Sequence, residues 1–406
     1  MTERVIEPRT VILARNAVAT VFILNGLNFA TLFSRVPDLR ERLDLSNGAL
    51  GLLLLSISVG SLLGLPASGR LIERFGAAGV VRGGAVLSTQ GLGIVALGVS
   101  GFEAEPVVAA GLGCYGFGTA VWDVAMNVEG AEVERHLGHT VLPRFHAAWS
   151  FGSIAGAGIG VVAAKLAIPL PLHFMMVGVA TLVAALVAVR AFLAIQEHDE
   201  EEVAANERSA WLEPRTLAIG AMVLAFTLAE GSANDWLALA LVDGYAAQHW
   251  VGVAGFALFV TAMTTGRLVG PVALDRFGRV PVLLVSAAAA FVGLLTVIVS
   301  SNPVLAAVGI VIWGLGAALG FPVGMSAAAD DPRRAPRRVS VVATIGYGAF
   351  LAGPPLLGFV GNEVGTLDSL YVVAAAMVPA AVLVLAVRRP RAAVGGGGTK
   401  SRHETR

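Results

Sequence analysis

The sequence predicts an all-α membrane protein with twelve transmembrane helices in two six-helix halves. Of its 406 residues, 56% are apolar and only 14% are charged, and the mean hydropathy is +0.77. A water-soluble domain with a polar surface could hardly have that composition. In addition, the charged segment Gly69 to Gly76 returns 202 positions later as Pro271 to Gly278 and ends on the same Arg-Phe-Gly. The two halves of the chain are therefore expected to be repeats of the same helical arrangement.

Apolar runs long enough to cross the membrane core, which takes about 20 helical residues, occur six times in each half. The first six lie near 12–34, 48–69, 77–100, 106–130, 145–165 and 169–193, and the second six near 216–241, 250–272, 280–300, 303–326, 339–361 and 369–388. Each copy of the repeated segment is a short charged hairpin between two runs. The first run resembles a signal peptide, but Asn25 and Asn28 interrupt it and no small-residue cleavage site follows. We expect it to be retained as a helix.

The polar segments divide the chain into four parts. Residues 1–195 are predicted to form the N-terminal six-helix half and residues 216–390 the C-terminal six-helix half. Residues 196–215, which contain Glu200, Glu201, Glu202 and Glu207, are predicted to be a linker. Residues 391–406 are predicted to be a disordered tail, because four glycines are followed there by polar residues.

The basic residues predict the orientation in the membrane. If the loops alternate, 24 of the 28 lysines and arginines lie on the side of the N-terminus, and only Arg35, Arg40, Arg42 and Lys165 lie on the other side. This asymmetry places both termini and the linker in the cytoplasm. Acidic and basic residues balance at 28 each, so no nucleic-acid partner is expected. The single cysteine, Cys114, indicates neither a disulfide nor a metal site, and no cofactor is expected.

The repeated hairpin resembles the Gly-x-Leu-x-Asp-Arg-x-Gly-Arg cytoplasmic signature of the major facilitator superfamily. The first copy has Glu73 in place of aspartate and Ala77 in place of the final basic residue, and the second copy has Pro271 in place of glycine. The resemblance implies the major facilitator fold, in which two halves rock about a central site. It also implies a cytoplasmic gate formed by Gly69, Glu73, Arg74, Gly76, Asp275, Arg276, Gly278 and Arg279.

Three further segments, Phe226 to Trp236, Pro143 to His146 and Gly353 to Gly358, are similar to bacterial permeases of the fucose-permease-like branch. This similarity implies a monomer in the bacterial inner membrane that handles a small solute and protons among membrane lipids. The arginine-containing fourth-helix motif of proton-driven drug exporters is missing from Pro106 to Gly130.

Glu230 is the first candidate for proton coupling. It lies about 15 residues into the seventh run and therefore near the middle of the bilayer. At the 202-residue offset it falls on Asn28, while Thr227 falls on Asn25. Helical spacing puts Thr227, Glu230 and Asn234 on one face, so each half has a polar stripe that could line a substrate path. A partly desolvated carboxylate can be neutral in one state and charged in another. Structural pairing with an arginine is the alternative, but no basic residue is expected in the middle third of any run.

Asp123 is the second candidate, because it lies some 17 residues into the fourth run with Asn127 one turn away. An acid at this depth needs a partner. It is either a proton site or part of the charge lock of the hairpin, paired with a basic residue such as Arg74, and the sequence favours neither.

Several other residues have both a functional and a structural interpretation. Tyr115 and Trp313 align at an offset of 198 and could stack on a substrate ring, although packing in the core is the commoner role for such aromatics. His146 could relay a proton, although a histidine in the first turn of a run is more often interfacial. Gly152, Gly156 and Gly160 recur every four residues, which favours close helix packing.

These observations predict a secondary active transporter that moves a small polar or amphiphilic solute by alternating access, with proton-coupled uptake as the expected mode. The alternative on the same fold is a proton-driven exporter of drugs or metabolites. A membrane sensor or membrane-embedded enzyme is a further class. It is disfavoured because the sequence has no metal-spaced Cys/His cluster, no phosphate-binding glycine loop and no acyl-transfer serine motif.

Overall fold

The computed structural model describes residues 7–45, 47–193, 209–247 and 249–388, and every regular element within these ranges is helical. The first half of the chain contains α1 (Pro8–Phe33), α2 (Val36–Arg42), α3 (Asn47–Leu97), a π-helical turn (Gly98–Phe102), α4 (Glu105–Leu137), α5 (Leu142–Lys165), α6 (Leu170–Ala188) and a 3-10 turn (Val189–Ala191). The predicted tail and most of the predicted linker lie outside the described residues.

The second half begins with a 3-10 turn (Ala210–Leu212) and continues with α7 (Pro214–Ser232), a π-helical turn (Ala233–Leu237), α8 (Ala238–Tyr245), α9 (His249–Phe277) and α10 (Arg279–Val299). It ends with α11 (Pro303–Ala317), α12 (Gly320–Ala328), α13 (Ala335–Val364), α14 (Thr366–Ser369), α15 (Tyr371–Leu383) and a 3-10 turn (Val384–Val387). Many of these helices, including α4, α5, α7, α11 and α13, have a proline in their first two positions. Proline suits that position because its missing N–H has no intrahelical partner there.

The repeated hairpin turns on a glycine in both halves. At 51 residues, α3 would be about 75 Å long if straight, more than twice the membrane core. It is instead two helices that meet at Gly76, whose φ is 70°. Gly278 separates α9 from α10 with a φ of 81°. Glycine adopts positive φ without steric cost, which explains why both copies of the hairpin end on this residue type.

The described chain contains eleven helical stretches long and apolar enough to cross a membrane. One of them contains both helices of α3, so the described residues supply twelve crossings. Three crossings are built from shorter helices in line: α7 with α8, α11 with α12, and α14 with α15. The predicted all-α membrane fold is confirmed.

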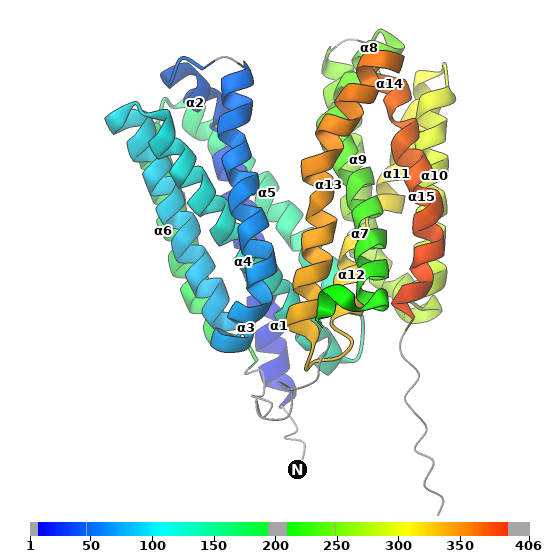
Figure 1. The fold of residues 1–406 in the computed structure, drawn as a ribbon, viewed down its shortest axis with the longest axis horizontal. Helices are drawn as coiled ribbons and strands as arrows, with labels where there is room; N and C mark the ends of the chain where they lie inside the picture. The colour runs from blue at the N-terminus through cyan, green and yellow to red at the C-terminus, as the bar shows by residue number, and fades with distance from the viewer. Residues whose placement is uncertain (1–6, 46, 194–208, 248, 389–406) are drawn as a thin grey trace, which may run out of the picture.

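The helices form two bundles side by side, α1–α6 and α7–α15 (Figure 1). The start of α1 and the end of the last helical turn lie at the same end of the molecule, which we call the terminal face; α2, α8 and α14 lie at the opposite face. The bundles approach each other at the terminal face and diverge toward the opposite face. Residues that connect the halves are therefore concentrated toward the terminal face.

Glycines bring helix backbones into direct contact within each half. A Cβ on Gly152 would lie 2.0 Å from the Ile23 carbonyl oxygen, and one on Gly156 would lie 2.5 Å from that of Leu27, so α5 packs on the backbone of α1. The packing interpretation of this glycine stripe is confirmed. One pair of glycines 202 residues apart, Gly91 and Gly293, has the same role in the two halves. Gly91 meets the backbone of Tyr115, and Gly293 meets that of Trp313.

Candidate functional site

A group of polar side chains lies at the interface between the two halves, and we call it the central network. Its members come from α4, α5, α7, α9 and α13, and they are Asp123, Asn127, His146, Ser150, Glu230, Arg267 and Tyr347. Both carboxylates predicted from the sequence belong to it. Burial of this many polar groups is tolerated only when they satisfy one another.

Glu230 and Arg267 form the charged end of the central network. One guanidinium nitrogen of Arg267, Nη2, contacts both carboxylate oxygens of Glu230, at 3.0 Å from Oε1 and 2.9 Å from Oε2. The guanidinium also donates to Ser150 Oγ at 3.2 Å and to the Ala318 carbonyl at 3.4 Å. Arg267 is only 3% exposed. The pair therefore joins a buried arginine to a partly buried glutamate, and further hydrogen bonds to the arginine offset the cost of burying its charge.

This pairing corrects two sequence-based expectations. Arg267 was counted with the basic residues of the N-terminal side, near the end of the predicted run 250–272, whereas it lies inside α9, ten residues before the helix ends at Phe277. Ten residues of α-helix rise about 15 Å, so the guanidinium lies deep in the membrane-spanning region. The expectation that no basic residue is available to Glu230 is therefore wrong.

Asp123 forms the other end of the central network and is 8% exposed. The Tyr347 hydroxyl donates to Asp123 Oδ2 at 3.0 Å, and this bond links α4 of one half to α13 of the other. Asn127 Nδ2 donates to the Asp123 carbonyl oxygen at 2.9 Å. Arg74 does not take part, because its guanidinium lies over the ring of Phe75. The expected pairing of Asp123 with Arg74 is not formed.

His146 connects the two ends. Its Nε2 lies 3.1 Å from Asn127 Oδ1, and its backbone carbonyl accepts a hydrogen bond from Ser150 Oγ at 3.2 Å. Rings of Phe22 and Phe321 pack edge-on against the imidazole, from opposite halves of the molecule. The expectation that His146 lies at the boundary between membrane and water is wrong, because the residue is 9% exposed and lies between the two halves of the protein. His146 thus links the Glu230 end to the Tyr347 end, through its backbone carbonyl on one side and its ring on the other.

The predicted polar stripes are present in part. Asn25 accepts a hydrogen bond from Trp149 Nε1 at 2.9 Å. Among the described residues, the Nδ2 atom of Asn25, both amide atoms of Asn28 and the hydroxyl of Thr227 have no hydrogen-bond partner although they are buried. Asn234 departs from the prediction. It lies in the π-helical turn after α7 and is exposed, because the wider turn breaks the spacing that would align it with Thr227.

Tyr115 and Trp313 do not join the central network. They are 1% and 0% exposed and belong to the apolar cores of the two halves, where Trp313 packs edge-on against Phe259 at 5.1 Å. The packing interpretation of these aromatics fits this position.

A second group of contacts joins the halves at the terminal face, and we call it the terminal clamp. Glu73 pairs with Arg337 across the interface at 2.5 Å. Its counterpart at the 202-residue offset, Asp275, accepts a hydrogen bond from the Thr140 backbone N–H at 2.8 Å, again across the interface. Each acid of the repeated hairpin therefore reaches the beginning of a helix in the other half, α13 or α5. Two of the predicted gate residues, Glu73 and Asp275, thus join the halves at the terminal face, and their role as a gate stays a prediction.

The remaining part of the terminal clamp links the predicted gate residue Arg279 to three residues not singled out in the sequence, Asp330, Ser326 and Glu134. Arg279 donates to Asp330 and to Ser326, both at 2.7 Å. Ser326 in turn donates to Glu134 of the other half, and Glu134 caps the start of α5 by accepting the N–H groups of Val141 and Leu142. Arg276, by contrast, lies over the Phe277 ring, as Arg74 lies over Phe75.

Asp275→Ala is expected to shift the protein toward conformations in which the terminal face is open. The substitution removes the acceptor for Thr140, and a single hydrogen bond contributes about 0.5–1.5 kcal/mol, so the shift should be roughly two- to tenfold. Thiol labelling of cysteines placed at the two faces measures it. Asp275→Asn is the graded control, because its amide oxygen can still accept. Unchanged labelling in Asp275→Ala would refute this role.

Comparison with known proteins identifies the family. The family model described as Major Facilitator Superfamily matches residues 18–271 and 246–405. The chain belongs to the major facilitator superfamily. An uncharacterized transporter, y4wD, of Sinorhizobium fredii is 31% identical over 348 residues, covering 85% of this chain and 90% of the relative. An uncharacterized MFS-type transporter of Yersinia pestis is 32% identical over 346 residues, covering 84% and 87%.

Solved major facilitator structures share the fold at low identity. The transporter FucP in the outward conformation superposes with a TM-score of 0.80 at 14% identity, over 94% of this chain and all of that one. The proton:xylose symporter XylE, bound to 6-bromo-6-deoxy-D-glucose, has a TM-score of 0.74 at 13% identity, over 93% and 95%. The predicted resemblance to major facilitators of the fucose-permease type is confirmed, and the chain is a multi-pass membrane transporter.

Proposed function

We propose that this protein is a proton-coupled transporter of a small polar solute, and that Asp123 is the group that takes up and releases the proton. The observation that carries the proposal is the difference between the two carboxylates of the central network. The carboxylate of Glu230 is paired with the cation Arg267, whose Nη2 contacts both of its oxygens. Among the described residues, no lysine or arginine forms an ion pair with Asp123, whose side chain has Tyr347 and Asn127 as partners.

A buried carboxylate without a cation favours its neutral form, because burial removes the hydration of the charge. Asp123 therefore carries a proton while the halves are joined at Tyr347. When the halves part, that hydrogen bond breaks and water reaches the carboxyl group, which favours release of the proton. Asp123 therefore replaces Glu230 as the first candidate for proton coupling. Glu230 instead fixes Arg267, which holds Ser150 of the other half.

The solute that best suits the interface is uncharged and rich in hydroxyl groups. The unpartnered groups of Asn25, Asn28 and Thr227 include donors and acceptors but no charge, and Trp149 of α5 donates to Asn25. An aromatic ring with nearby amides and hydroxyls suits the apolar face and polar edge of a sugar-like molecule. Two proteins of similar structure fit this class, since one is a fucose:proton symporter and another a proton:xylose symporter.

We infer further that the terminal face is cytoplasmic and that this conformation faces outward. The basic residues concentrate on the terminal side, even after Arg267 is excluded. A reporter active only outside the cytoplasm should work when fused after Glu105, at the opposite face, and fail when fused after Arg406. Activity of the second fusion would reverse the orientation.

Transport in vesicles tests the function itself. A solute is first found by thermal-shift screening of the purified protein against sugars, acids and drugs. Accumulation in vesicles whose interior is alkaline supports proton-coupled uptake, because protons then flow inward. Accumulation only when the interior is acidic would support the exporter instead. Transport indifferent to the pH gradient would refute the coupling.

A further inference from the structure

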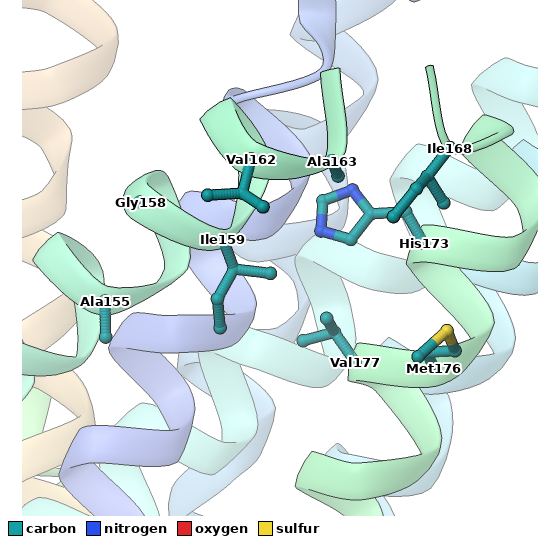
Figure 2. A pocket seen from close by; sticks show the side chains of 9 residues that line it. All are labelled: Ala155, Gly158, Ile159, Val162, Ala163, Ile168, His173, Met176 and Val177. Atoms are coloured by element: carbon teal, nitrogen blue, oxygen red, sulfur yellow. The ribbon is translucent and has the colours of Figure 1, made fainter. Parts of the chain in front are cut away.

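A pocket separate from the central network lies on the side of the N-terminal half, between α5 and α6. Its volume is about 430 Å³, and its lining comes from Ala155, Gly158, Ile159, Val162, Ala163, Ile168, His173, Met176 and Val177 (Figure 2). The volume falls in the range of about 300–1,000 Å³ typical of small-molecule sites. Apart from His173, the lining side chains are apolar. The pocket is therefore shaped for a mainly hydrocarbon ligand.

The pocket opens toward the perimeter of the bundle. Both α5 and α6 pack on α1, which holds the two helices side by side. On α5, Gly158, Ile159 and Val162 are exposed, whereas Gly152 and Gly156 on another face of the same helix are buried against α1. Exposed apolar side chains within a membrane-spanning helix contact lipid chains. The bilayer is thus the natural source of a ligand.

His173 places one polar atom at the base of this apolar pocket. The residue is 3% exposed, and its imidazole points from α6 toward Ile159 and Val162 (Figure 2). Arg35 Nη1 lies 3.4 Å from Nδ1 of His173. Because arginine can only donate, Nδ1 accepts, and the proton of the neutral ring is on Nε2. Among the described residues Nε2 has no hydrogen-bond partner. The pocket therefore presents an unsatisfied N–H donor.

The surroundings hold the ring in that orientation. Arg35 is fixed by Asp38, whose carboxylate oxygens lie 2.9 and 2.6 Å from the guanidinium, and it donates to the Ile168 carbonyl at 3.2 Å. The charge of Arg35 is thus already balanced by Asp38, so an anionic group is not needed at the base of the pocket. The N–H donor of His173 instead needs a neutral hydrogen-bond acceptor, such as a carbonyl oxygen.

The depth of the donor matches the ester region of a membrane lipid. His173 is three residues after the first residue of α6, Leu170, and hence about 4.5 Å along the helix from its start at the opposite face. Lys165 is exposed at the end of α5, between pocket-lining residues Val162 and Ile168 in sequence. A basic side chain at that level suits a lipid phosphate.

From these features we propose that the pocket binds one ester-linked glycerophospholipid. An acyl chain fills the apolar groove between α5 and α6, the ester carbonyl accepts from His173 Nε2–H, and the phosphate lies near Lys165. The site is distinct from the solute path, and its test requires no transport measurement.

The test uses phosphatidylglycerol with a photoreactive diazirine in one acyl chain, added to the purified full-length protein, followed by peptide mapping of the crosslinks. We expect saturable labelling within residues 155–177. Gly158→Phe should reduce it at least about fivefold, because the new ring occupies the pocket. A Cβ on Gly158 meets nothing within 4 Å, so the variant should fold. Gly83→Phe is the matched control, since Gly83 is also an exposed helical glycine with open space beside it.

The role of His173 is tested by competition between two unlabelled lipids. Ester-linked phosphatidylglycerol should compete roughly two- to tenfold better than its ether-linked analogue, which lacks the carbonyl acceptor and so loses one hydrogen bond. In His173→Phe the two lipids should compete equally. Labelling that rises linearly with lipid, or that Gly158→Phe leaves unchanged, would mean ordinary annular contact and overturn the site. Equal competition by both lipids in the unmodified protein would overturn the hydrogen bond that defines the proposal.

Discussion

Asp123→Asn is expected to abolish solute accumulation driven by a pH gradient while leaving solute exchange intact. With one proton per solute, each pH unit can support about tenfold accumulation, because about 1.4 kcal/mol corresponds to a factor of ten. The variant should not accumulate solute above the external concentration. Asparagine keeps the size of the side chain and an oxygen that can accept from Tyr347, so the contact between the halves survives. Only the exchangeable proton is lost.

Glu230→Gln is the matched comparison, because it neutralises the other carboxylate of the same network. It should impair accumulation and exchange together, since Arg267 then lacks its counter-charge and the solute path itself is disturbed. Counterflow into vesicles loaded with unlabelled solute measures exchange, and the same vesicles with an imposed pH gradient measure accumulation. If Glu230→Gln loses accumulation alone and Asp123→Asn keeps it, Glu230 is the coupling carboxylate and the assignment to Asp123 fails.

Arg267→Met should destabilise the protein by about 3–5 kcal/mol, because it leaves the mostly buried Glu230 carboxylate, whose side chain is 15% exposed, without a cation. Methionine has a similar length and is apolar, so packing changes little. The double variant Arg267→Met with Glu230→Gln should recover most of the loss, since neither charge remains. Thermal unfolding in detergent, followed by intrinsic fluorescence, measures both.

Arg82→Met serves as a control for losing an arginine, because Arg82 is exposed on α3. Its effect should stay within about 0.5 kcal/mol, as for most surface substitutions. If Arg267→Met unfolds at the same temperature as the unmodified protein, the ion pair does not stabilise this fold. If the double variant is no more stable than the single one, the loss comes from packing and not from an unpaired carboxylate.

The sequence was sufficient to predict the fold, because the signals were long-range and redundant. Each crossing is a run of about 20 apolar residues, and the repeated hairpin relates the halves through Gly76 and Gly278, whose positive φ angles only glycine adopts readily. The two membrane carboxylates were also found, because an acid inside an apolar run is rare and costly. Such features need no knowledge of the neighbouring helices.

The residues that pair with the two carboxylates of the central network could not be predicted from the sequence in this way. Arg267 lay close to the predicted end of its run, and the length of α9 beyond Gly270 decides that it is an interior residue. Tyr347 is an ordinary aromatic in sequence, and its bond to Asp123 depends on how two halves dock. Asn234 was misplaced because a π-helical turn shifts the spacing, and nothing in the local residue types indicates such a turn.

The bonds that join the halves have a consequence for the empty carrier. Tyr347 with Asp123, Arg267 with Ser150, and Glu73 with Arg337 must all part before the terminal face can open. If each contributes about 0.5–1.5 kcal/mol, their combined loss slows reorientation by one to three powers of ten unless solute contacts compensate. A transporter that seldom changes conformation without bound solute carries few protons across the membrane without solute. The tightness of coupling would then be set by the interface between the halves as much as by the affinity for the solute.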